Sequence, residues 1–242
     1  FVPTKDLASG QIYTATLNLT SIDTDVAKEH ASFDFQFKAK DQFVNIHPLA
    51  SKISKSNQQT WVELRGELST HDTEDFKNIE TLLTAYVGGQ KIGINWQHLE
   101  QNKHQFTLEK VAKKRQAYPV VWKWDGRSIG SKNKGEQKIN IAPETQFTYV
   151  KNYLKQQGQE IILEFSDLLA PDQNLKGLVQ LDAKNLRYSI EDNQIKLFTD
   201  GFMQGSKSLK IAADIQSISG KTLSDPIEET ITFSEIKPAV AW

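Results

Sequence analysis

The side chains best suited to metal binding are five histidines, two of which are spaced so that they could meet. His98 and His104 flank a polar stretch, and a hairpin there would place them face to face. No histidine pair has the i, i+2 or i, i+4 spacing with a carboxylate companion that metal sites favour. We therefore predict no metal site and expect surface or turn roles. The other three histidines are His30, His47 and His71.

A group of acids at Asp72, Glu74 and Asp75 could in principle hold calcium. The stretch lacks the alternating acid spacing with a central glycine that calcium loops use. Apolar residues follow at Phe76, Ile79, Leu82 and Leu83, on one stripe of a helix. We therefore predict an amphipathic helix near residues 71–85, with the acids favouring its positive N-terminal end.

Four tryptophans could form an aromatic platform that stacks on sugar rings. They are Trp61, Trp96, Trp122 and Trp124, of which the last two lie two residues apart and share a strand face. Aromatic strips in β-proteins are more often core, and we favour that interpretation. The platform requires at least two exposed and roughly coplanar indoles, so exposure separates the two hypotheses.

Charge gives no sign of a nucleic-acid partner. The chain has 29 basic and 30 acidic residues, for a net charge of -1. The short run Lys113-Lys114-Arg115 is typical of a solvated loop between strands. No apolar run approaches the roughly 18 residues of a membrane helix.

No motif in the chain points to catalysis. There is no Gly-x-Ser-x-Gly elbow, no glycine-rich phosphate loop and no His-Glu-x-x-His. Cysteine is absent, which excludes disulfides, zinc–thiolate sites and thiol nucleophiles. We expect no cofactor and no catalytic residue. Two carboxylates far apart in sequence could still meet, so glycoside hydrolysis stays a weaker, third hypothesis.

The elements that would position these residues are mostly short strands in the N-terminal part. Alternating apolar residues predict strands at 12–19, with one buried face, and at 32–37, with three phenylalanines on one side. Val44 and Ile46 form a third run that Pro48 ends. The Ser-, Lys-, Asn- and Gln-rich stretch 51–60 is typical of an exposed loop. Further strands are predicted at 61–68, 86–87, 91–96, 105–109, 120–124 and 137–141.

Pro143-Glu144-Thr145 is the best domain boundary, because a proline closes one strand just before a new alternating series. The predicted domains are 1–143, β-rich with one helix and an alternative split near 50–60, and 144–242. Seven short strands with regular turns in the second are typical of an immunoglobulin-like sandwich. They are predicted at 147–154, 159–165, 177–181, 186–190, 195–199, 207–213 and 229–234.

Several phrases in fixed order resemble one family. Ile161-Ile162-Leu163-Glu164-Phe165-Ser166-Asp167-Leu168-Leu169 is followed by Leu175-Lys176-Gly177-Leu178-Val179, and upstream stand Gly93-Ile94-Asn95-Trp96 and Trp122-Lys123-Trp124-Asp125-Gly126. Over about residues 60–242 the series resembles the N-terminal macroglobulin-like region of bacterial alpha-2-macroglobulins. No single phrase is specific, and the ordered series carries the resemblance.

The resemblance implies tandem macroglobulin-like, immunoglobulin-like β-sandwiches, the first with one inserted helix. Members of the family trap proteases that cut a bait segment, and many carry a Cys-x-Glu-Gln thioester, which cannot exist here without cysteine. We therefore expect non-catalytic scaffold, extracytoplasmic and either periplasmic or outer-membrane-anchored. Its partners would be downstream domains and, for the whole protein, proteases. A membrane contact would come only through an N-terminal lipid anchor outside these residues. The alternative is a cell-surface module that binds carbohydrate or protein through exposed aromatics.

Overall fold

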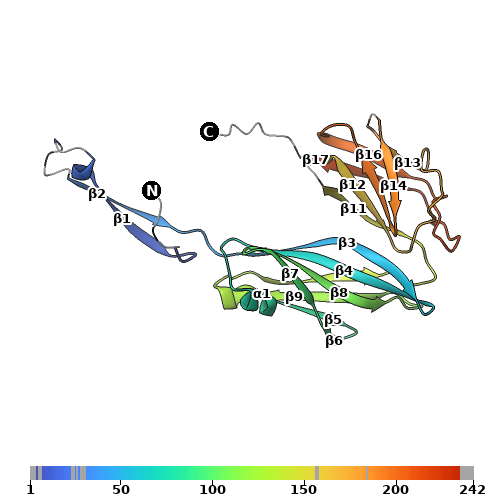
Figure 1. The fold of residues 1–242 in the computed structure, drawn as a ribbon, viewed down its shortest axis with the longest axis horizontal. Coiled ribbons are helices and arrows are strands. Elements are labelled where there is room, and N and C mark those ends of the chain that lie inside the picture. Colours follow the sequence, from blue (N-terminus) through green and yellow to red (C-terminus); the bar gives the residue numbers. More distant parts are fainter. Residues whose placement is uncertain are drawn as a thin grey trace.

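The chain is mostly β, arranged in several small antiparallel sheets (Figure 1). The computed structural model describes residues 4, 7–22, 25, 27, 31–155, 158–183 and 185–234. Within those residues there is one α-helix, and no helix has the length and apolar character needed to cross a bilayer. The β-rich character expected from the alternating residues is confirmed.

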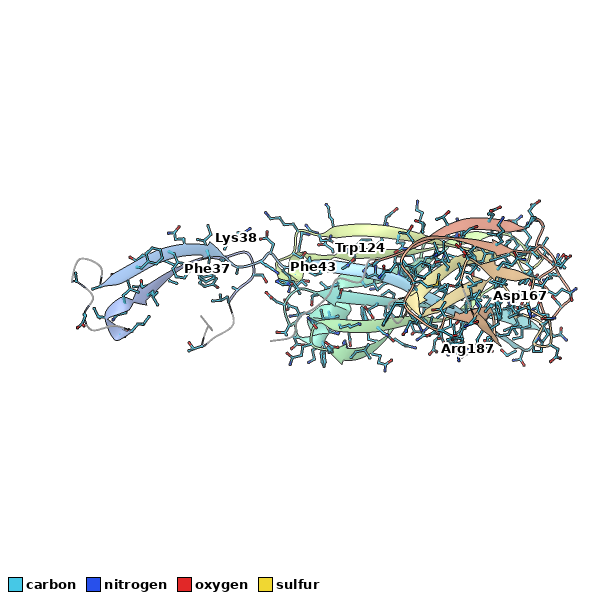
Figure 2. All side chains as sticks on the ribbon, turned by 90° about the horizontal axis from the view of Figure 1, so that it is seen from above. Phe37, Lys38, Phe43, Trp124, Asp167 and Arg187 are labelled. Carbon is cyan, nitrogen blue, oxygen red and sulfur yellow. The ribbon has the colours of Figure 1, made fainter. Side chains whose placement is uncertain are left out.

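An N-terminal hairpin stands away from the rest of the protein (Figure 1). It consists of β1 (Ile12–Asn18) and β2 (Ser32–Lys38), with a short 3-10 turn, η1 (Leu19–Ser21), after β1. Figure 2 shows Phe37 and Lys38 on this hairpin, far from Trp124 and Asp167. Both strands were predicted, but the buried face expected for the first was wrong, since Leu17 is 43% exposed. No other described sheet packs on the hairpin.

The next hundred residues form two four-stranded antiparallel sheets around one core. The first sheet has the order β3-β4-β8-β7 and the second β10-β9-β5-β6. Buried side chains of both sheets meet, as in the edge-to-face contact of Phe106 with Trp122, whose ring centroids lie 4.8 Å apart. The strands of the first sheet are β3 (Val44–Ser56), β4 (Gln59–Thr70), β8 (Lys103–Ala112) and β7 (Asn95–Glu100). Those of the second are β10 (Lys134–Ile141), β9 (Tyr118–Asp125), β5 (Leu83–Val87) and β6 (Gln90–Ile92).

The predicted end of a strand at Pro48 and the predicted loop at 51–60 are both wrong. β3 continues through Pro48 to Ser56, and β4 begins at Gln59 after a turn at Asn57 and Gln58. Proline is tolerated because β3 is an edge strand, where a missing N–H breaks no ladder on its outer side. Polar composition alone predicted a loop at 51–60. Most of these residues belong instead to the long two-stranded ribbon of β3 and β4.

The helix is shorter than the predicted 71–85. α1 spans Phe76–Leu82, preceded by residues of β4 up to Thr70 and followed directly by β5 at Leu83. Its buried residues are Ile79 and Leu82, which join the core of the two sheets. The predicted apolar stripe is therefore present in the helix. Its last residue, Leu83, instead begins β5, which pairs with β9.

The C-terminal part forms a four-stranded and a three-stranded sheet around a second core. The orders are β11-β12-β15-β14 and β13-β16-β17. All seven predicted strands are confirmed, each within about two residues. They are β11 (Tyr149–Lys155), β12 (Glu160–Phe165), β13 (Val179–Leu181), β14 (Arg187–Glu191), β15 (Gln194–Phe198), β16 (Gly205–Ile211) and β17 (Ile227–Phe233). A further 3-10 turn, η3 (Gly126–Ile129), follows β9.

The two cores share no residue. One contains buried residues from Val44 to Ile141, and the other from Phe147 to Phe233. The chain thus passes from one core to the other around the predicted boundary at Pro143. The division into two domains, 1–143 and 144–242, stays a prediction.

Candidate functional site

The four tryptophans do not form an exposed platform. Trp61 and Trp96 lie on β4 and β7 of one sheet, while Trp122 and Trp124 lie on β9 of the other. Trp122 is fully buried, and its Nε1 has no hydrogen-bond partner among the described residues. The other three are half-buried, and both Trp96 and Trp124 pack against the core. The condition of two exposed indoles is therefore not met.

His98 and His104 do face each other, as predicted. They pair across β7 and β8, and their Nδ1 atoms lie 2.9 Å apart. The surface role expected for His104 is wrong, since it is fully buried beneath Phe76, whose ring stacks on His98 at 4.1 Å. Burial, with a smaller effect from His98, lowers the pKa of His104 to about 4. Glu80 lies 3.2 Å from His98 Nε2.

The described residues contain no group of three or more side chains able to hold a metal ion. His47 lies 2.8 Å from the Asn45 amide, and His71 stacks on Phe43. His30 lies outside the described residues.

The three acids Asp72, Glu74 and Asp75 each have a different hydrogen-bond partner. Asp75 is the N-cap of α1 and accepts from the Lys77 N–H at 2.8 Å. Asp72 accepts from the Ser9 hydroxyl, and Glu74 accepts from the Gln42 amide at 3.0 Å. Electrostatic favouring of the helix start therefore holds for Asp75 alone.

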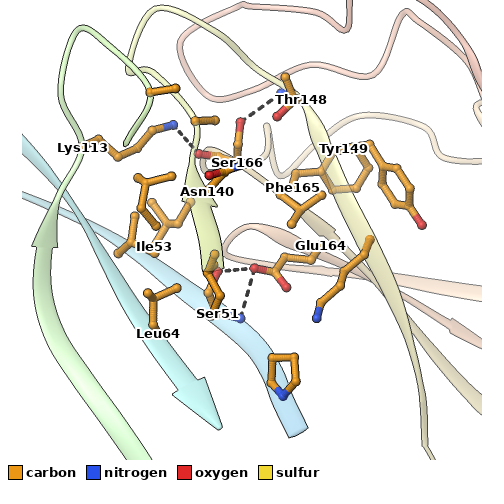
Figure 3. A pocket seen from close by; sticks show the side chains of 18 of the residues that line it. Ser51, Ile53, Leu64, Lys113, Asn140, Thr148, Tyr149, Glu164, Phe165 and Ser166 are labelled. Carbon is orange, nitrogen blue, oxygen red and sulfur yellow. Dashed lines mark hydrogen bonds between the residues drawn. The ribbon is translucent and has the colours of Figure 1, made fainter. Parts of the chain in front are cut away.

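A buried polar contact joins the two cores of the protein at Glu164. This side chain is on β12 and accepts hydrogen bonds from the Ser51 N–H at 3.1 Å and from the Ser51 hydroxyl (Figure 3). The Tyr153 hydroxyl lies 2.6 Å from Glu164 Oε2 and 2.9 Å from the Leu49 carbonyl, and it can donate to one of them at a time. A buried carboxylate of the second part is thus held by β3 of the first.

Two amides beside Glu164 complete this contact. Asn193 accepts from the Ile53 N–H at 3.2 Å and donates to the Phe165 carbonyl at 3.0 Å. Gln194 donates to the Ser51 carbonyl at 2.9 Å. Together with Tyr153 and Glu164 they satisfy backbone groups on the outer side of β3, an edge strand. We call the set Ser51, Tyr153, Glu164, Asn193 and Gln194 the polar joint.

Lys113 forms a second contact between the two parts. Its ammonium donates to the Ser166 carbonyl, and its backbone N–H donates to the Thr60 carbonyl at 2.9 Å (Figure 3). The predicted solvated loop is wrong for this residue, which is buried, whereas Lys114 and Arg115 are exposed. Nearby, Lys55 lies 3.2 Å from the buried Asp167 carboxylate.

Burial is the largest single influence on the pKa values of Glu164, Lys113 and Asp167. It raises the pKa of Glu164, opposed by the hydrogen bonds from Ser51 and Tyr153. It lowers the pKa of Lys113 to about 8, opposed by the carboxylate of Asp167. Burial also acts to raise the pKa of Asp167, but the Leu168 N–H and Lys55 outweigh it and the net shift is downward. All three side chains serve as hydrogen-bond or ion-pair partners, which suits fixation of two parts of the chain.

The polar joint was missed because β3 was taken for a loop at Ser51. One signal was present in the sequence. Glu164 stands between the apolar run Ile161-Ile162-Leu163 and Phe165. The alternation of Ile161, Leu163 and Phe165 by itself predicts a strand with one buried face, which would leave Glu164 in solvent. Ile162 is buried as well as Leu163, so both faces of β12 are covered and Glu164 has to be buried with its partners.

Comparison with known proteins does not place the chain in a family. No protein-family model matches the sequence, and no curated protein matches it significantly.

Proposed function

We propose that these residues are non-catalytic N-terminal scaffold domains of a large bacterial alpha-2-macroglobulin-like protease-trapping inhibitor. The observation that supports this best is the polar joint. A scaffold must hold successive domains in one orientation, and satisfied buried hydrogen bonds are directional enough to specify it. The contact uses two main-chain N–H groups of β3, at Ser51 and Ile53, so it depends on the position of the backbone.

The proposal includes a finer description of the fold. Residues 144–242 would be an immunoglobulin-like, macroglobulin-type sandwich, because side chains of its four-stranded and three-stranded sheets share one core. Residues 1–143 would be the preceding domain, with α1 inserted between β4 and β5. The ordered motifs over residues 60–242 support the family assignment.

The same proposal includes the partners and the cellular location of the protein. Its partners would be downstream domains of the same longer chain and, for the whole inhibitor, proteases. Its location would be extracytoplasmic, either periplasmic or anchored at the outer membrane through an N-terminal lipid. Catalysis, cofactors, metal ions and nucleic acid have no part in it.

The gene provides the first test. We expect its reading frame to continue for well over a thousand codons beyond Trp242, with repeated β-domains and a bait-like segment. A stop codon soon after Trp242 would contradict the proposal. A second test compares residues 1–242 with the long protein: the long protein should inhibit a protease, and residues 1–242 alone should not. Stoichiometric inhibition by residues 1–242 alone would also reject a scaffold role.

The second candidate is a surface module that binds another protein through exposed aromatics. The observation that favours it lies in the N-terminal hairpin, not in the tryptophans. Phe33 and Phe35 are 57% and 38% exposed, and their rings are stacked 6.1 Å apart. Binding of this kind would require the hairpin, so a variant lacking residues 7–40 should lose it, while the scaffold role would depend on the polar joint.

A further inference from the structure

A cavity of about 500 Å³ lies beside the polar joint, where three edge strands come together (Figure 3). β3, β10 and β11 each line it, and each is the terminal strand of its sheet. The edge of a sheet presents N–H and C=O groups that no neighbouring strand has taken. A cavity between such edges has the means to bind a polypeptide backbone.

β10 turns its free edge toward this cavity. Its residues and those just after it line the cavity without a gap, from Gln137 to Pro143. Because successive side chains of a strand point to opposite faces, an uninterrupted run can line one space only along the strand edge. Among the described strands β10 pairs with β9 alone, so its other edge is open.

β11 contributes a similar run at an irregular position. Tyr149, Val150 and Lys151 line the cavity in succession, directly after Thr148, which precedes the strand and also lines it. The register with β12 shifts between Tyr149 and Lys151, as it does at a β-bulge. Bulges are frequent at sheet edges and beside binding sites, where they redirect a side chain. Val150 is left 46% exposed.

The lining combines apolar side chains with cations. Ile53, Val62 and Leu64 are buried residues that contact the cavity, and Ile139 of β10 adds a half-buried one. These surfaces suit the alternating apolar side chains of an extended segment.

Positive charge dominates at the cavity. Among the described residues, Arg65, Lys113, Lys138 and Lys151 line it, against one carboxylate, that of Glu164. That carboxylate is already engaged by Ser51 and Tyr153. Glu136 and Glu63 approach Lys138 and Arg65 only from outside the cavity, at 3.6 Å and 3.9 Å. The Lys151 ammonium lies 4.5 Å from the centroid of the Tyr153 ring, and burial lowers its pKa. A ligand carboxylate would meet an excess of cations here.

We propose that this cavity receives an extended segment of a partner polypeptide, which adds a strand to the free edge of β10. The segment would alternate apolar residues and would carry an aspartate or glutamate that lies near Lys138 and Lys151. Main-chain hydrogen bonds would supply affinity, while the apolar surface and the cations would select the sequence. The inference stands apart from the protease-trap proposal, because it depends only on the cavity and its edges.

A pooled library of displayed eight-residue peptides tests it. The library alternates apolar with random residues, and selection is carried out on the whole 242-residue chain. We expect enriched peptides to contain at least one aspartate or glutamate. An enriched peptide is then synthesised in its natural form and in two N-methylated forms, one methylated at odd and one at even residues, so that each form removes the N–H donors on one edge of the strand without changing the side chains. One of the two methylated forms should bind roughly tenfold or more weakly in fluorescence polarisation, and the other should bind nearly as well as the natural peptide.

A matched pair of variants tests the charge. Lys138→Glu and Lys134→Glu reverse the same charge on the same exposed strand, but only Lys138 lines the cavity. Lys138→Glu should weaken binding by roughly tenfold, and Lys134→Glu should leave it within about twofold. Unchanged melting temperatures would show that both variants fold.

Any of four results would overturn the proposal. The first three are no enrichment from the library, equal binding of the natural peptide and both N-methylated forms, which would indicate a simple apolar pocket, and equal effects of the two variants. A dimer of the chain that dissociates on Lys138→Glu, measured by light scattering, would identify a second copy as the occupant and would contradict a partner polypeptide.

Discussion

Ser51 donates two hydrogen bonds to Glu164, one from its backbone N–H and one from its hydroxyl, although the two residues are 113 positions apart. Both are buried, and each belongs to a strand of a different sheet. This pair connects the two cores of the protein and leads to the first prediction.

Removal of Glu164 should destabilise the protein more than removal of the Ser51 hydroxyl. Glu164→Ala leaves the buried N–H and hydroxyl of Ser51 without their acceptor, while the Tyr153 hydroxyl can still donate to the Leu49 carbonyl. The substitution should cost about 2–3 kcal/mol of unfolding free energy. Ser51→Ala removes one hydrogen bond and should cost about 1 kcal/mol. Both are measured by urea unfolding. Glu160→Ala on the same strand is the control and should change stability by about 0.5 kcal/mol or less. Equal losses for Glu164→Ala and Glu160→Ala would show that the polar joint contributes little.

His104 should make the protein less stable in acid. Its pKa is about 4 in the folded state against 6.5 for a free histidine, so the unfolded chain binds more protons between these values. The contribution of His104 is therefore fully present above pH 6.5 and declines as the pH falls toward 4. The full loss is on the order of 3 kcal/mol.

The His104 effect is isolated by a comparison of variants. Unfolding free energies of wild type and His104→Leu are measured from pH 7.5 to 4, and their difference should change with pH in the sense given above. His47→Gln is the control, since His47 lies on an exposed part of β3. A pH-independent difference between wild type and His104→Leu would show that the buried ring does not titrate in this range.

A side chain at Gly66 should destabilise the protein. A Cβ placed there would lie 2.2 Å from Cζ of Phe106, a fully buried ring. Gly66→Ala must therefore displace Phe106 and should cost roughly 1–3 kcal/mol. Gly93→Ala is the matched control, because a Cβ at Gly93 would have no heavy atom within 4 Å. Thermal unfolding of the two variants is the test, and Gly66→Ala should have the lower melting temperature. Similar melting temperatures would mean that the core accommodates the added Cβ without cost.

The aromatic face of the N-terminal hairpin should contribute to surface hydrophobicity and not to the stability of the two cores. Phe35→Ser should lower the fluorescence of a bound apolar dye, while the main unfolding transition changes by about 0.5 kcal/mol or less. Gln36→Ser, its neighbour on the opposite face, should change neither. A large loss of stability on Phe35→Ser would show instead that the ring is part of the protein core.

The alternation of residues was enough to predict most strands, because a strand with one covered face needs an apolar residue at every second position. It located all seven strands of the C-terminal part, including β12, although both faces of that strand are buried. The polar stretch between His98 and His104, in turn, predicted their pairing across a hairpin. Alternation failed for β3, where an edge position permits Pro48 and where polar residues such as Ser51 bind a neighbouring sheet. It also failed for the end of α1, because a short apolar stripe fits a helix followed by a strand equally well.

The sequence by itself determined the β-rich character, the absence of thiol chemistry and the change of pattern near Pro143. Only the tertiary structure decided that Trp122 and His104 are buried, that Lys113 lies between the two parts, and that Ser51 meets Glu164. The physical reason is that periodicity reports which face of an element is covered but not what covers it. Partners in a buried polar contact are selected by the approach of sheets distant in sequence, and no local pattern records that approach.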